Sequence, residues 1–321
     1  MPAPAETKII FFGNERLATG VTTTAPTLQT LIDTGYDVVA VVSHYERSKS
    51  RNARKLEIAA VAETHKIPLL LPEKPADIID ELQAYNATLG VLVAYGKIVP
   101  QRVIDVFPRG IVNIHPSLLP LHRGPTPLES VILEGATETG VSIMALAQAM
   151  DAGPVYDQTR LTLRGNETKQ ELADLLIGHG KNLLTEALPG IIDGSLPGQP
   201  QDDGQATYDA LISKEDGEMD FSKPALQLER EIRAYAEWPK SRTTIAGKEV
   251  VVTAGHVLDP GAADNFGNYS NHKPTSEPFA TADGKIGLPT ADSILAVDML
   301  KPAGKQEMTA AAFLTGYGHL L

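Results

Sequence analysis

The sequence predicts an α/β domain built on a parallel sheet, followed by a smaller all-β domain. Three observations lead to this prediction. Over the first 110 residues, short apolar segments alternate with amphipathic ones, which is typical of a parallel sheet covered by helices on both faces. Residues 194–210 are rich in Gly, Pro, Asp and Gln, as a linker should be. Beyond them, shorter apolar segments are divided by turn residues, which favours a small barrel or sandwich.

The elements of the first domain follow in chain order from their apolar patterns. KIIFFG has the length of a buried strand, whereas APTLQTLIDTG has helical periodicity and ends at Gly35. The helix predicted after HRG has Pro near its start and Gly at its end. The predicted strands span 8–13, 37–44, 68–72, 87–96, 110–116 and 140–148, and an unassigned segment spans 153–163. The predicted helices span 25–35, 53–67, 76–86, 125–135 and 168–194.

The second domain is predicted from two segments with a β pattern. Residues 236–258 alternate around a Gly-Lys turn, and residues 286–305 do the same with shorter strands. A chain of 321 residues has room for two domains. We therefore expect a first domain over 1–205, the end of a linker over 206–212 and a second domain over 213–321.

The composition excludes several classes of chemistry. The chain has no cysteine, so disulfides, thiolate nucleophiles and cysteine-ligated zinc are ruled out. The N-terminal residues lack the basic and apolar regions of a secretory signal. The longest apolar runs fall short of the roughly 20 residues that span a bilayer, so we expect no membrane association.

One segment of the chain is basic although the chain as a whole is acidic. The net charge of −12 argues against broad, non-specific binding of nucleic acid. Residues 47–55 nevertheless contain five cations and no anion. This segment is either a solvated loop or a local anchor for an anionic substrate. Its cations are Arg47, Lys49, Arg51, Arg54 and Lys55.

Three polar residues mark the candidate site. Asn113 and His115 stand two apart at the end of a predicted strand, so both side chains point to the same side of the sheet. Ligands of open α/β sheets bind at the carboxyl ends of the strands. Asp151 follows a later strand and precedes Gly153, so we expect it on a loop at the same edge. Each alone also fits a structural role: a core histidine, a turn-capping amide and an Asx cap.

The three residues together suggest transfer of an acyl group. Dinucleotide, phosphate-loop, H-E-x-x-H and G-x-S-x-G motifs are absent, and the histidines lack the spacing of a metal site. An amide, an imidazole and a carboxylate fit the direct attack of an amine on a carbonyl carbon. Asn113 and His115 could donate hydrogen bonds to the oxyanion, while Asp151 could hold the histidine and assist proton movement.

Residues 113–127 and 138–155 resemble the core of the folate-dependent formyltransferases. The resemblance implies that Asn113, His115 and Asp151 are catalytic, that 10-formyltetrahydrofolate is the formyl donor and that no metal takes part. It also implies two sets of folate contacts, one on a turn and one on the strand and turn at 91–100. These are Ser117, Leu118, Leu119 and Pro120 on the turn, and Val93, Ala94, Tyr95 and Gly96 at the end of the earlier strand.

Two further segments resemble the branch of this family that formylates methionyl-tRNA. Residues 211–239 and 300–316 are similar to the start and the end of its second domain. The resemblance implies a Rossmann-like domain followed by an OB-like β-barrel that binds tRNA, and direct transfer through a tetrahedral intermediate. It further implies initiator methionyl-tRNA as a partner, a bacterial cytoplasmic location and no protein partner. In that branch the loop at 47–55 contacts the tRNA.

The sequence departs from the family pattern in two places. GNERL follows the first strand where the family usually has Gly-Thr-Pro, and the basic loop lacks its usual Gly and Pro. From Ser213 onward there are eleven Lys or Arg and fifteen Asp or Glu, a net charge of −4, which is unusual for an RNA-binding barrel. Two alternatives therefore stay open: a formyltransferase that acts on a small amine such as a UDP-amino sugar, and a folate- or RNA-binding protein without catalysis.

Overall fold

The computed structural model describes residues 4–44, 56–258 and 277–321. The chain forms two compact units. The first comprises Met1–Leu128, Thr137–Arg164 and Gln170–Ala210. The second comprises Glu129–Ala136, Gly165–Lys169 and Leu211–Leu321. Within the described ranges, no helix is both long enough and apolar enough to cross a membrane.

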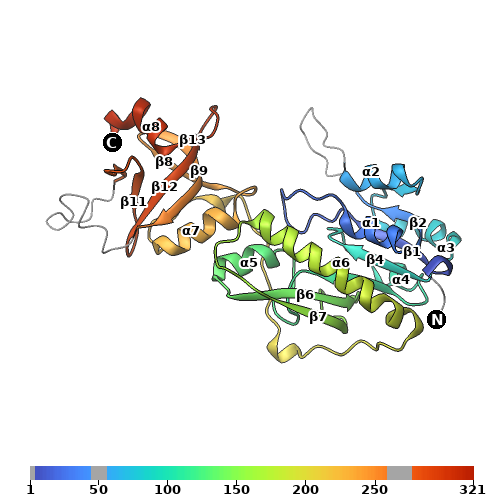
Figure 1. Cartoon of the computed structure of the whole chain (residues 1–321). Coiled ribbons are helices and arrows are strands. Elements are labelled where there is room, and N and C mark those ends of the chain that lie inside the picture. The colour runs from blue at the N-terminus through green and yellow to red at the C-terminus, as the bar shows by residue number, and fades with distance from the viewer. Residues whose placement is uncertain (1–3, 45–55, 259–276) are drawn as a thin grey trace. The chain divides into compact units, whose positions relative to one another are not determined.

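The described part of the first unit is organised around a seven-stranded sheet with the order β3-β2-β1-β4-β5-β6-β7 (Figure 1). Strands β1 to β5 are parallel, as the sequence predicts. In β1 the side chains of residues 9–12 are wholly buried, which explains its unbroken apolar sequence. The parallel strands are β1 (Lys8–Gly13), β2 (Asp37–Val42), β3 (Leu69–Leu70), β4 (Leu89–Val93) and β5 (Ile111–His115).

The sheet is mixed, because its last two strands run the other way. Strand β6 (Glu138–Ala145) is antiparallel to β5, and β7 (Val155–Thr162) is antiparallel to β6. The parallel sheet predicted from the first 110 residues is confirmed, and β6 and β7 extend it beyond them with antiparallel strands. Only nine residues join β6 to β7, fewer than the dozen or so that a parallel crossover needs. The segment 153–163, left unassigned from the sequence, is this edge strand.

Helices cover the sheet of the first unit (Figure 1). The long helix α6 packs closely on β5 and β6, because a Cβ atom at Gly180 would lie 2.7 Å from a methyl of Ile114. In the core of this unit, Phe12 of β1 makes edge-to-face contacts with Tyr95 and Phe107. The helices of this unit are α1 (Pro26–Asp33), α2 (Glu57–Thr64), α3 (Ile79–Ala84), α4 (Gln101–Ile104) and α6 (Lys169–Asp193), whereas most of α5 (Pro127–Glu134) belongs to the second unit. Helix α4 is absent from the prediction.

Helix α1 is capped by a residue far from it in sequence. Ala25 at its N-cap position offers no side-chain acceptor. The buried carboxyl group of Glu15 instead accepts hydrogen bonds from the backbone N–H groups of Thr27 and Leu28, both at 2.8 Å. Burial raises the pKa of Glu15 to about 7, against the opposing effect of these hydrogen bonds. The unusual GNERL sequence thus supplies the cap of α1.

Strands β1 and β4 approach closely where they end. Gly13 has a φ of 139°, and a Cβ atom there would lie 1.9 Å from the carbonyl oxygen of Val93. Only glycine combines this backbone conformation with this contact. The two segments stay close beyond the ends of the strands, since the backbone N–H of Asn14 donates to the carbonyl of Ala94 at 3.4 Å.

The described part of the second unit contains a curled antiparallel sheet with the order β10-β11-β12-β9-β8, and β13 pairs with β12. The register between β9 and β12 shifts at Met299, which interrupts their ladder of backbone hydrogen bonds. Irregularities of this kind bend the strands that contain them. Helices α7 (Ala225–Ala234) and α8 (Ala310–Tyr317) bury Leu228, Ile232 and Phe313 against it. The strands are β8 (Ser241–Ile245), β9 (Lys248–Val257), β10 (Phe279–Ala280), β11 (Ile286–Pro289), β12 (Ile294–Pro302) and β13 (Met308–Thr309).

Candidate active site

A cavity of about 450 Å³ opens in the first unit at the carboxyl ends of β1, β4 and β5. Its walls come from residues 14–21 after β1, residues 94–96 after β4 and residues 113–116 at the end of β5, together with Asp151. This is the edge at which an open α/β sheet binds its ligands. The cavity therefore contains all three of the predicted catalytic side chains.

The two polar residues of β5 are buried in this wall. Asn113 is 6% exposed and His115 is 4% exposed. They point to the same side because they stand two apart on one strand. His115 places Nε2 2.9 Å from the backbone carbonyl oxygen of His122. A carbonyl can only accept, so Nε2 carries the proton and Nδ1 is left as the ring atom available for proton transfer.

Asp151 lies opposite that ring atom. Its Oδ2 is 3.8 Å from Nδ1 of His115, an ion-pair distance rather than a hydrogen bond. The same Oδ2 accepts a hydrogen bond from the backbone N–H of Gly124 at 2.8 Å. Asp151 has a φ of 49°, in the left-handed region. The carboxylate is thus oriented by backbone geometry and stands ready to pair with a protonated imidazole.

The route by which Asp151 reaches this position differs from the predicted one. On the antiparallel strand β6, Ser142 is paired with His115 but Ala145 is paired with Val112. The strand therefore leads away from the carboxyl end of β5, and residues 146–150 must return to bring Asp151 beside His115. The predicted proximity is correct, although a shared carboxyl edge of parallel strands does not explain it.

The segment after β4 contributes three of the predicted folate contacts to the cavity. Ala94, Tyr95 and Gly96 line it, whereas Val93 is buried within β4. Tyr95 is 1% exposed, and its ring meets His44 edge to face. Its hydroxyl has no hydrogen-bond partner among the described residues, and burial raises its pKa to about 12. The hydroxyl is therefore a neutral, buried donor without a described partner.

The turn at 117–120 lies outside the lining of this cavity. Ser117 is wholly buried, and its hydroxyl donates to the backbone carbonyl of Leu121 at 2.6 Å. The hydroxyl of Ser142 donates to the carbonyl of Ser117 and accepts from the N–H of Leu119. These bonds give the turn a structural part beside the site, and its predicted contact with folate stays a prediction.

The segment after β1 is a part of the cavity wall for which the sequence predicts no role. Residues 14–21 line one wall, and Arg16 in this segment pairs with Glu57 at 2.6 Å. The signal was present in the sequence, because this segment follows the carboxyl end of a central parallel strand. The absence of a dinucleotide motif excluded one ligand class there, not every ligand.

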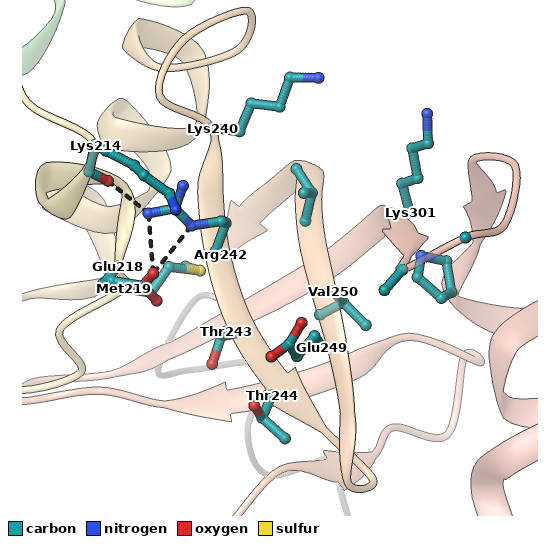
Figure 2. Close-up of a pocket in the computed structure, with 14 residues that line it drawn as sticks. Lys214, Glu218, Met219, Lys240, Arg242, Thr243, Thr244, Glu249, Val250 and Lys301 are labelled. Carbon is teal, nitrogen blue, oxygen red and sulfur yellow. Dashed lines mark hydrogen bonds and ion pairs between the residues drawn. The ribbon is translucent and has the colours of Figure 1, made fainter.

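The predicted tRNA-binding cations lie outside the described residues. These are Arg47, Lys49, Arg51, Arg54 and Lys55. A second basic feature, which we call the β8–β9 cavity, lies in the second unit and measures about 660 Å³ (Figure 2). Its lining includes Lys214, Lys240, Arg242 and Lys301.

The cations of the β8–β9 cavity are not equivalent. Arg242 pairs with Glu218 at 2.9 Å and also donates to the backbone carbonyl of Lys214. Figure 2 shows Lys240 and Lys301 extended without such partners, and neither ammonium group forms an ion pair with another described side chain. Two cations are therefore available to an anionic ligand on an otherwise acidic unit.

Comparison with protein families matches both parts of the chain. Residues 7–188 match the model of the family "Formyl transferase", and residues 211–318 match "Formyl transferase, C-terminal domain". A protein of Chloroflexus aggregans named methionyl-tRNA formyltransferase is 35% identical over 315 residues, covering 96% of this chain and 97% of its own. A protein of the same name from Roseiflexus castenholzii is also 35% identical, with 96% of both chains covered.

Solved structures share the fold at lower sequence identity. HypX from Aquifex aeolicus in complex with tetrahydrofolic acid matches with a TM-score of 0.65 and 17% identity, over 96% of this chain and 47% of that one. WlaRD, a sugar 3N-formyl transferase, matches with the same TM-score and identity over 94% of this chain and 99% of its own. At such identity these structures establish the fold alone.

Proposed function

Because the chain belongs to the formyl transferase family, and within it to the methionyl-tRNA formyltransferases, we propose that it formylates initiator methionyl-tRNA. The formyl donor in this proposal is 10-formyltetrahydrofolate, and the acceptor is the α-amino group of the methionyl ester. The observation that supports the chemistry best is the presence of Asn113, His115 and Asp151 in the wall of one cavity. The proposed setting is the cytoplasm of a bacterium.

The reaction is a direct transfer. The amine attacks the formyl carbon, a C–N bond forms and the carbonyl oxygen becomes an oxyanion. The bond from this carbon to N10 of the folate then breaks, and the proton lost by the amine ends on N10. The buried amide of Asn113 donates a hydrogen bond to the oxyanion. A donor of this kind is worth about 2.7–4 kcal/mol of transition-state stabilisation.

His115 and Asp151 move the proton. Since Nε2 of His115 is occupied by the carbonyl of His122, Nδ1 takes the proton from the attacking amine. The charge that develops on the imidazole is stabilised by Asp151 at 3.8 Å. The same proton then passes to N10 as the leaving group departs, so the enzyme returns to its starting state.

The folate and the tRNA have separate proposed contacts. The lining of the cavity by residues 94–96 supports a folate site there, and the turn at 117–120 completes it by analogy with the family. The basic loop at 47–55 and the second unit bind the tRNA. We keep the proposed domain limits of 1–205 and 213–321, with the linker ending over 206–212.

One experiment separates this proposal from its competitor, the formylation of an amino sugar nucleotide. The purified protein is incubated with 10-formyltetrahydrofolate and either charged initiator tRNA or a UDP-amino sugar. We expect formylation of the methionyl-tRNA alone. Formylation of the sugar alone would reject the proposed acceptor, and formylation of neither would reject the activity.

The same assay tests the role of the amide. Asn113→Ala should lower kcat by about 10²–10³-fold, the range seen when one oxyanion donor is removed. Asn182, an exposed asparagine on α6, provides the matched control as Asn182→Ala. A loss confined to KM in Asn113→Ala would contradict the proposed oxyanion contact.

A further inference from the structure

The segment after α6 is fastened to the loops of the candidate active site. Residues 199–209 belong to the first unit, as do those loops. Arg123 exchanges backbone hydrogen bonds with this segment, donating to Thr207 at 2.9 Å and accepting from Asp209 at 2.8 Å. Gln199 and Val155 exchange a second pair at 2.8 and 2.7 Å. The composition of this segment predicts a linker, but its backbone is ordered by these contacts.

The side chain of Gln201 makes the central connection. Its Nε2 donates to the backbone carbonyls of Asp151 and Gly153, both at 2.7 Å. Its Oε1 accepts from Nε and Nη2 of Arg123 at 3.0 and 2.8 Å. Arg123 is 1% exposed, so its guanidinium is a fixed anchor rather than a mobile surface group. Gln201 therefore ties the turn containing Asp151 to a buried cation.

The turn that contains Asp151 depends on contacts of this kind to keep its conformation. Asp151 is in the left-handed backbone region, which a non-glycine residue keeps only when its surroundings hold it there. Gly153 has no room to adjust, since a Cβ atom there would lie 1.8 Å from the carbonyl oxygen of Ala145. The carbonyl that Gln201 holds belongs to Asp151 itself, so the bond fixes the peptide next to the carboxylate.

We infer that Gln201 is a positioning residue for formyl transfer. It holds Asp151 at its distance from Nδ1 of His115 by bonding the Asp151 turn to Arg123. It does not line the cavity, so it acts through Asp151 and not on the substrate. This inference rests on the proposed function, because it assigns Gln201 a part in that reaction.

The test is a double-mutant cycle. Gln201→Met keeps the length of the side chain and removes its donors and its strong acceptor. We expect it to lower kcat at least tenfold, with KM for folate and for methionyl-tRNA within twofold of wild type. In an Asp151→Ala background, measured at single turnover, the same substitution should change the rate less than twofold, because the group it positions is gone.

Two further variants keep the test decisive. Gln205→Met is the matched control, since Gln205 is exposed and, within the described part of the chain, its side chain bonds to Asp202 on the same segment alone; its kcat should stay within twofold of wild type. If Gln201→Met lowers the melting temperature by more than about 5 °C, Gln201→Glu replaces it. That variant keeps the acceptor for Arg123 and loses donation to Asp151 and Gly153, so it should show the same loss of kcat.

The outcomes distinguish the inference from its premise. An equal loss of rate in the wild-type and Asp151→Ala backgrounds would show a merely structural role and overturn the inference. An unchanged kcat in Gln201→Met, or in Gln201→Glu where it is used, would do the same. Failure of the wild-type protein to formylate methionyl-tRNA would instead reject the proposed function.

Discussion

At the scale of single residues, His115 is oriented by the backbone. The carbonyl of His122 fixes the protonated nitrogen, and His122 is itself held by Thr207 and Asp209. The imidazole thus has one possible direction for proton transfer, toward Nδ1 and Asp151. Sequence spacing predicts the shared side of Asn113 and His115, but it cannot predict the ring's hydrogen bond, which comes from a loop seven residues away.

The first prediction concerns this imidazole. His115→Ala should lower kcat by about 10²–10⁴-fold, because the reaction loses its proton carrier. The fold should persist, since the ring's hydrogen bond among the described residues goes to one backbone carbonyl of a loop with other supports, and Asp151 keeps its bond to Gly124. Kinetics and thermal denaturation check both parts. The control is His65→Ala on an exposed histidine, and full activity of His115→Ala would end the mechanistic proposal.

The second prediction concerns the buried cap of α1. Burial raises the folded-state pKa of Glu15 to about 7 from its ordinary value of 4.5. The protonated form is thus favoured by folding, so the contribution of Glu15 is fully present below pH 4.5 and is lost as the pH rises through 7. Relative to Glu15→Gln, the wild-type free energy of unfolding should fall by about 2–3 kcal/mol between pH 4.5 and pH 8.

Denaturant titrations at several pH values measure that difference. Glu186→Gln, at an exposed position on α6, should leave the pH dependence of wild type unchanged. Parallel stability curves for wild type and Glu15→Gln would show that Glu15 keeps its charge in the folded state. The two backbone hydrogen bonds would then outweigh its burial.

At the scale of elements, the sequence predicts strands better than it predicts their directions. The apolar runs of β1, β2 and β4 are continuous because both faces are covered, and this pattern is visible without a structure. The direction of β6 leaves no such trace, since α5 between β5 and β6 would also permit a parallel connection. The short helix α4 was missed because four residues contain too little periodicity.

The third prediction tests the anchoring of residues 199–209. Arg123→Met removes a buried guanidinium and leaves Oε1 of Gln201 without its donors, which should cost about 1–3 kcal/mol. The segment should also become more accessible to protease. Asp203→Asn is the contrasting variant, because Asp203 is 81% exposed and its ion pair should be worth less than about 1 kcal/mol. Equal effects of both would contradict this ranking.

At the scale of the whole molecule, positive charge is concentrated in two places although the chain as a whole is acidic. The chain has a net charge of −12, yet the cations at 47–55 and in the β8–β9 cavity are locally concentrated. Bulk charge therefore does not decide the question of RNA binding. The sequence predicts the first cluster, because residues 47–55 contain five cations and no anion. It cannot predict the second, because Lys240 directly precedes β8 and Lys301 lies in β12, and only the fold brings them to one cavity.

The fourth prediction concerns the basic loop. Reversing the charges of Arg47, Arg51 and Arg54 to Glu should weaken methionyl-tRNA binding and reduce its salt dependence, because phosphate contacts are lost. Folate binding should be unchanged. Arg102→Glu, on an exposed position of α4, is the control. Unchanged tRNA affinity in the triple variant would favour an acceptor without a phosphate backbone.

The fifth prediction concerns the β8–β9 cavity. Lys240→Glu combined with Lys301→Glu should raise KM for methionyl-tRNA severalfold and leave KM for the folate donor unchanged. The matched variant is Arg242→Gln, whose guanidinium is already paired with Glu218 and should contribute less to binding. If neither substitution alters KM for the tRNA, the second unit binds it through another surface.

The contact at Gly13 restricts how this site can be redesigned. A methyl group there would collide with the carbonyl of Val93, so the seam between β1 and β4 would have to open at the mouth of the cavity. A saturation library at this position should return glycine alone. Attempts to admit a bulkier one-carbon donor should therefore vary the opposite walls and leave that seam untouched.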